Sequence, residues 1–151
     1  MTSSEIRGNI RYNENLINQF YNEKRGLESQ LNDLESLRNK FTVLQNNFEN
    51  RQNARRRSIA RFTGLSIQNK IFKNYFSGMQ ELITGSSFNR AYAGLDEAKN
   101  RIRNQMQYIM QRIDECENSI TYRIRRKAYW ESQLRIALEQ EAVAAANSSE
   151  V

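Results

Sequence analysis

Apolar residues recur in the first part of the chain, from about residue 4 to residue 57, mostly at intervals of three, four or seven. Such spacing lines one face of a helix and is typical of a coiled-coil seam. Thr2 followed by Glu5 matches a capping box that would begin this helix. Its predicted seam consists of Ile6, Ile10, Ile17, Phe20, Leu27, Leu31, Leu34, Leu37, Phe41, Leu44 and Phe48.

A second periodic stretch covers residues 87–144 and predicts another long helix. The steps again alternate between three and four, which indicates one continuous apolar face. Residues 147–151 should fray, because chain ends without packing partners are poorly ordered. The predicted seam consists of Phe88, Ala91, Leu95, Ala98, Ile102, Met106, Ile109, Ile113, Cys116, Ile120 and Ile124, followed by Trp130, Leu134 and Leu138.

Between the two arms lies a shorter apolar stretch that predicts a third helix over residues 66–83. Gly64 and Gly85 flank it and read as helix punctuation, whereas Gly78 falls inside the pattern. The chain has no proline. We therefore expect an all-α fold in one domain, an elongated antiparallel helical hairpin with the third helix at its closed end.

The matched lengths of the arms also suggest which residues face each other. In a symmetric hairpin the region near Arg55 faces Asp96 and Glu97, and the region near Glu23 faces Arg123. Both pairings bring opposite charges together, so much of the charge pattern has a structural explanation.

Charge is concentrated in the middle of the chain. The whole sequence has a net charge of +6, and residues 51–90 hold 8 Lys or Arg against 1 acid. A solvated basic face is one interpretation, and a phosphate-binding patch with nearby aromatic residues is another. The basic patch consists of Arg51, Arg55, Arg56, Arg57 and Arg61.

Few residue types suited to catalysis or metal binding are present. The sequence has no histidine and one cysteine, Cys116, which occupies a predicted seam position. A histidine general base is therefore excluded, and we expect neither enzymatic activity nor a cofactor or metal. The N-terminal residues lack the apolar segment of a cleavable signal peptide, and we expect no membrane span.

Two short patterns are candidates for partner binding. Phe-x-Gly occurs at Phe62–Gly64 and at Phe76–Gly78, where an aromatic ring and a glycine could admit another helix. Tyr92 and Asp96 are four residues apart and share a helix face. The predicted partner-binding residues are Phe62, Gly64, Ile67, Ile71, Phe72, Tyr75, Phe76, Gly78 and Met79.

The stretch FTGLSIQNKIFKNYFSGMQELITGSSFNRAYAGLDEAKNRI, within two long helices, resembles the small WXG-type helical proteins of type VII secretion. It is most similar to the larger members found beside LXG-domain toxins in Gram-positive bacteria. In this resemblance Phe62-Thr63-Gly64 stands for the Trp-x-Gly turn, with Phe in place of Trp. Tyr92 with Asp96 stands for the export-type Tyr-x-x-x-Asp, although it lies early in the last helix rather than near its end.

The resemblance implies a cytoplasmic targeting protein that binds the helical domain of an LXG toxin, or another small WXG-like protein, and can be exported with it. Two alternatives from other classes stay open. One is a generic coiled-coil scaffold or homodimer. The other is a nucleic-acid-binding module that uses the basic patch at residues 51–61.

Overall fold

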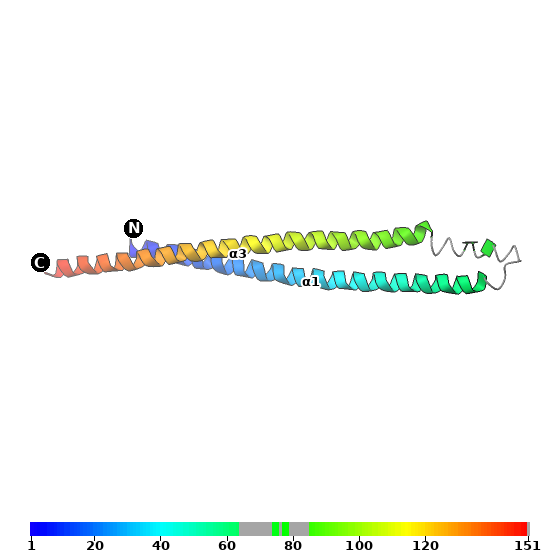
Figure 1. Ribbon diagram of the computed structural model, residues 1–151. Coiled ribbons are helices and arrows are strands. Elements are labelled where there is room, and N and C mark those ends of the chain that lie inside the picture. The colour runs from blue at the N-terminus through cyan, green and yellow to red at the C-terminus, as the bar shows by residue number, and fades with distance from the viewer. Residues whose placement is uncertain (64–73, 76, 79–84, 151) are drawn as a thin grey trace. The chain divides into compact units, whose positions relative to one another are not determined.

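The computed structural model describes residues 1–63, 74–75, 77–78 and 85–150, and it is helical throughout most of them. Of these residues 97% are helical and none is in a strand. Two long helices, α1 (Ser3–Thr63) and α3 (Ser86–Ser149), pack against each other as a hairpin (Figure 1). The predicted all-α class and hairpin are thus confirmed. Most of the predicted third helix lies outside the described residues, although residues 74–75 and 77–78 are helical.

The start of α1 is a capping box, as the sequence predicts. The Thr2 hydroxyl accepts a hydrogen bond from the Glu5 backbone N–H at 3.3 Å, and the Glu5 carboxylate accepts one from the Thr2 N–H at 2.8 Å. These two bonds satisfy backbone donors that the first helical turn leaves without partners.

Both helices are longer than their periodic patterns suggest. Helix α1 continues past residue 57 to Thr63, and α3 includes residues 147–149, which were expected to fray. The alanines that precede this end are the strongest helix formers. The Ser148 and Ser149 hydroxyls donate to the Ala145 and Ala146 carbonyls at 3.0 and 2.8 Å.

The hairpin divides into two compact units. Unit 1 comprises residues 1–31 and 108–151, and unit 2 comprises residues 32–107. In unit 1 the buried apolar residues are Ile6 and Leu27 of α1 and Ile109, Cys116, Ile120 and Ala137 of α3. In unit 2 they are Ile59 of α1 and Ile102 of α3.

The seam of α1 follows a strict heptad, but some of its positions are polar. Asn13, Gln45 and Gln52 are buried in it, whereas Leu37 and Leu44 are 41% and 54% exposed. The prediction that these two leucines belong to the seam is therefore wrong. Gln45 lies four residues after Phe41 and three before Phe48, and this spacing places all three on the helix face toward α3, whatever their polarity.

The seam of α3 deviates from the prediction in the same way. Ile124 and Leu138 are 47% and 41% exposed, whereas the neighbouring Ala137 is buried and Arg123 is half-buried. Ala91 is also exposed, and Tyr92 takes the inner position. The observed heptad of α3 runs through Ile102, Ile109 and Cys116. Further steps of seven residues reach Arg123 and Ala137, which directly precede the exposed Ile124 and Leu138.

Polar contacts establish the antiparallel pairing in each unit. In unit 1 the Lys127 ammonium lies 3.1 Å from the Glu14 carboxylate, and the Lys24 ammonium lies 3.1 Å from that of Glu117. In unit 2 the Gln45 amide donates to Asp96 at 2.7 Å. Residues later in α1 therefore meet residues earlier in α3.

The predicted facing of the arms is displaced from the observed one. Asp96 contacts Gln45 rather than the region of Arg55, and Glu23 pairs with Arg112 rather than with Arg123. Both differences amount to about three helical turns along one helix. The prediction assumed arms that end together, whereas Ser3 of α1 meets Glu141 and α3 continues beyond that contact.

Candidate partner-binding site

Unit 2 contains a groove that joins two features singled out in the sequence. It has a volume of about 340 Å³ and brings Tyr92 and Asp96 of α3 beside Arg56 of α1. Its remaining lining consists of Glu49, Asn53, Phe88, Asn89 and Ala93. The predicted Tyr-x-x-x-Asp pair and one member of the basic patch therefore belong to one surface.

Asp96 is held at the edge of this groove by a polar network. Its carboxylate accepts a hydrogen bond from the Gln45 side-chain amide at 2.7 Å. The Gln45 carbonyl oxygen in turn accepts one from the Lys99 ammonium at 3.2 Å. Because Gln45 is 5% exposed, the network extends into the seam and restricts the orientation of Asp96.

Aromatic rings form the apolar side of the groove. The Phe88 ring stacks on Phe48 with a centroid separation of 5.1 Å and on Tyr92 at 6.1 Å. The Arg56 guanidinium lies 5.7 Å from the Phe88 ring centroid, within the range of a cation–π interaction. The sequence pattern assigned Phe48 and Phe88 to the seams but did not indicate that Phe88 lines the groove, because that depends on the pairing of the arms.

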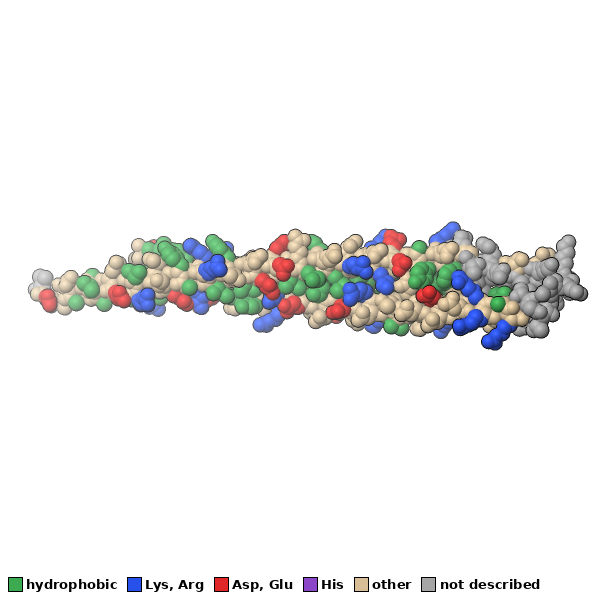
Figure 2. All heavy atoms as spheres, in the orientation of Figure 1, with side chains coloured by type: hydrophobic (Ala, Val, Ile, Leu, Met, Phe, Trp, Pro, Cys, Tyr) green, Lys and Arg blue, Asp and Glu red, His purple; other side chains and the backbone are tan. Residues whose placement is uncertain are grey.

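The basic patch is exposed along the last turns of α1. Arg51, Arg55, Arg56, Arg57 and Arg61 are all exposed. No ion pair joins any of them to a carboxylate within the described part of the chain. Figure 2 shows basic side chains at this end of the helix. A solvated face agrees with this exposure, but Arg56 has an additional contact with Phe88.

Most of the predicted partner-binding residues lie outside the described residues. These are Gly64, Ile67, Ile71, Phe72, Phe76 and Met79. Phe62 belongs to α1. Tyr75 is 61% exposed, and a side chain in place of Gly78 would begin more than 4 Å from any described atom outside its own stretch of backbone.

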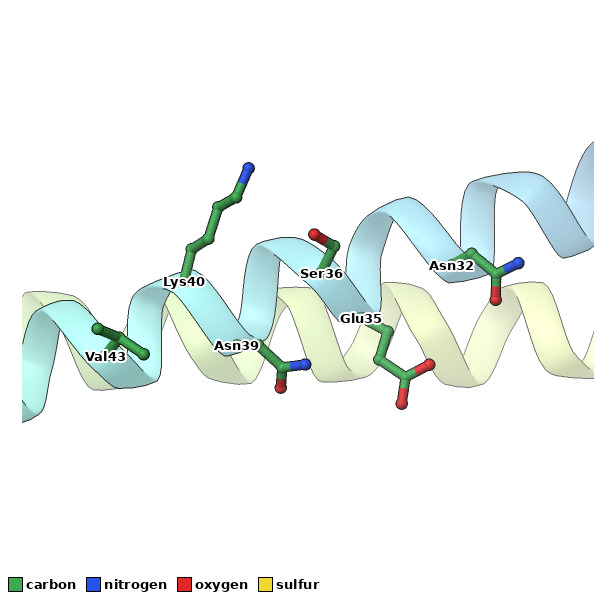
Figure 3. Close-up of a pocket in the computed structure, with 6 residues that line it drawn as sticks. All are labelled: Asn32, Glu35, Ser36, Asn39, Lys40 and Val43. Carbon is green, nitrogen blue, oxygen red and sulfur yellow. The ribbon is translucent and has the colours of Figure 1, made fainter.

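A second surface depression lies on α1 alone. It is lined by Asn32, Glu35, Ser36, Asn39, Lys40 and Val43 (Figure 3). Their spacing of three and four residues places them on one outward helix face. Because α3 contributes no lining residue, this depression is an open helix surface rather than a site built between elements.

Cys116 has the environment of a structural residue. Its side chain is 4% exposed, and burial raises the pKa of the thiol above its ordinary value. A thiol that is protonated and covered reacts slowly.

The described residues contain neither a metal-binding cluster nor a membrane-spanning helix. No cluster of three or more His, Cys, Asp or Glu side chains is arranged there to hold a metal ion. No described helix has a stretch apolar and long enough to cross a bilayer.

The chain matches no known family, curated protein or solved structure.

Proposed function

We propose that this chain is a non-enzymatic helical binding protein, a targeting partner that holds an LXG-domain toxin and promotes its export by type VII secretion. The main support is the groove of unit 2. It offers a partner helix aromatic surface, a carboxylate and a guanidinium within a short distance. The resemblance to WXG-type proteins specifies the class of partner.

The groove suits a helix because its lining combines aromatic and charged side chains. Phe88 and Tyr92 supply apolar contact area, while Arg56 and Asp96 provide opposite charges in the lining. Interface energy concentrates on aromatic and arginine side chains, whereas charges at the rim mainly select the partner. The predicted tip residues, including Phe76 and Gly78, are part of the same proposal.

The test is co-expression of the chain with an LXG domain of a toxin, followed by titration. Arg56→Gln and Asp96→Asn should each weaken the complex by about tenfold, because each removes one charge from the groove. Arg57→Gln is the matched control, since Arg57 is an exposed neighbour that does not line the groove. Failure of the wild-type chain to bind the LXG domain would refute the proposal.

Tip variants test the other part of the predicted surface. Phe76→Ala should weaken capture by about 30-fold or more, as expected for an aromatic residue at the centre of an interface. Gly78→Leu should also weaken it through steric exclusion. The melting temperature of each purified variant should stay near that of the wild type. A collapse of that temperature would assign these residues to the internal core instead.

Nucleic-acid binding is a second candidate, and one observation favours it. The basic patch exposes five arginines that have no carboxylate partner within the described residues. Binding through phosphates would weaken steeply with salt, and the combined change of Arg55, Arg56 and Arg57 to Gln would reduce that dependence. If nucleic-acid binding is the function, Arg56→Gln and Arg57→Gln should weaken binding equally. If the groove binds a helix, only Arg56→Gln should weaken it, so this pair of variants distinguishes the two candidates.

A further inference from the structure

Helix α3 carries a second seam in unit 1, outside the one that faces α1. Its positions alternate in steps of three and four, as coiled-coil positions do. The four large apolar members are Tyr122, Tyr129, Ile136 and Val143, with exposures of 55%, 48%, 42% and 60%. Arg125, Ser132, Glu139 and Ala146 occupy the positions between and after them.

The far end of this second seam extends past the start of α1. The Ser3 N–H and hydroxyl both donate to the Glu141 carboxylate, at 3.2 and 3.1 Å. Every residue from 141 to 150 is exposed, yet α3 remains helical to Ser149. The last two turns of α3 therefore present side chains that α1 does not cover.

The second seam carries two opposite charges at equal distances from Ser132 along the helix. Arg125 precedes Ser132 by seven residues, and Glu139 follows it by seven. Neither forms an ion pair within the described part of the chain. Around Arg125, the guanidinium of Arg126 lies 5.4 Å from the Tyr129 ring centroid, so this stretch is basic as well as aromatic.

We propose that the second seam binds a second copy of this chain, with the two α3 helices antiparallel and crossing near Ser132. This arrangement places Arg125 of each copy opposite Glu139 of the other and covers the four exposed apolar residues. In a parallel pair in register, Arg125 would instead face Arg125 of the other copy, and Glu139 would face Glu139. The surface lies in unit 1, does not involve the groove and does not depend on the proposed function.

The spacing argues against a nucleic acid on this surface. Tyr122 and Tyr129 are seven residues apart, or about 10 Å along a helix. Consecutive stacked bases require much closer rings, whereas heptad spacing is what a second helix requires. Ile136 and Val143 continue the same row with aliphatic side chains, which suit a helix interface.

The first test is sedimentation of the purified full chain, without any partner, at concentrations up to about 100 µM. A reversible dimer is expected. Tyr129→Glu combined with Ile136→Glu should weaken it at least tenfold, because both side chains would be buried at the contact. Ile124→Glu with Leu138→Glu is the matched control, since these residues are similarly exposed on another face of α3. A chain that stays monomeric, or equal effects of both pairs, would overturn the proposal.

A charge exchange tests the antiparallel orientation. Arg125→Glu alone and Glu139→Arg alone should each weaken self-association by about tenfold, because each opposes like charges twice in a symmetric pair. Mixing the two variants should restore affinity, since both contacts in the mixed pair are again of opposite sign. Lack of recovery would rule out the proposed pairing, while circular dichroism checks that both variants remain helical.

Discussion

At the residue scale, Thr2 and Glu5 stabilise the first turn of α1. The side chain of each accepts a hydrogen bond from the backbone N–H of the other. Removing the accepting hydroxyl by Thr2→Ala should lower the free energy of unfolding by about 1 kcal/mol. Thermal melting of the variant beside the wild type measures this loss. Ser4→Ala is a suitable control, because its exposed side chain has no described hydrogen bond in the cap.

The same capping box predicts a pH dependence. The hydrogen bond from the Thr2 N–H holds the pKa of Glu5 below its ordinary value. A carboxylate whose folded pKa is depressed stabilises the fold above its unfolded pKa, and this contribution disappears as pH falls through the folded value. Glu5→Gln should therefore destabilise the chain at neutral pH and have little effect in strong acid. An equal effect at both pH values would contradict this role.

Two isoleucines of α3 test the observed seam directly. Ile109 is 2% exposed and Ile124 is 47% exposed, although the sequence pattern assigned both to the seam. Ile109→Ala should cost about 2–5 kcal/mol of unfolding free energy, because it opens a cavity in the contact. Ile124→Ala should cost no more than about 0.5 kcal/mol. Chemical denaturation measures both, and similar losses would favour the original assignment.

These isoleucines also show why the seam was only partly predictable. Positions such as Leu27 and Ile109 were identified because apolar side chains and the heptad coincide there. At Gln45 and Arg123 the heptad continues through polar side chains, so following apolarity selected Leu44 and Ile124 instead. The backbone geometry maintains the helix face regardless of which side chain occupies it.

At the element scale, the polar residues buried in the seam differ in their effect on the stability of the fold. Gln52 is 8% exposed and its side-chain oxygen has no partner among the described residues. Gln52→Leu should raise the melting temperature, because it removes a buried acceptor without a hydrogen bond and adds apolar contact. Gln45→Leu is the contrasting variant, since it deprives Asp96 and Lys99 of their partner. A higher melting temperature for both would show that the Gln45 network contributes no stability.

The pairing of the elements was less predictable than their existence. Long periodic stretches without proline indicate two helices, and equal lengths suggest a hairpin. Their register depends on which polar residues meet, as Gln45 meets Asp96, and several offsets by one heptad bury similar apolar rows. Consequently the sequence identified Tyr92 and Asp96 but not the groove that they form with Arg56.

At the scale of the whole molecule, helix content is the simplest prediction. Circular dichroism of the purified chain should give more than about 70% helix, well above the one-third typical of globular proteins. The two long helices alone require this value. A substantial β-sheet signal would contradict the hairpin.

The contact between α1 and α3 has almost no interior among the described residues. Among the described residues no large side chain is less than 2% exposed, and even Ile109 is 2% exposed. Backbone amides in such a contact should exchange with deuterium through small local openings. A helix that docks onto either arm would add the missing layer, so complex formation should slow exchange along the seam as well as at the docking surface. Deuterium uptake would therefore report any bound helix before its identity is known.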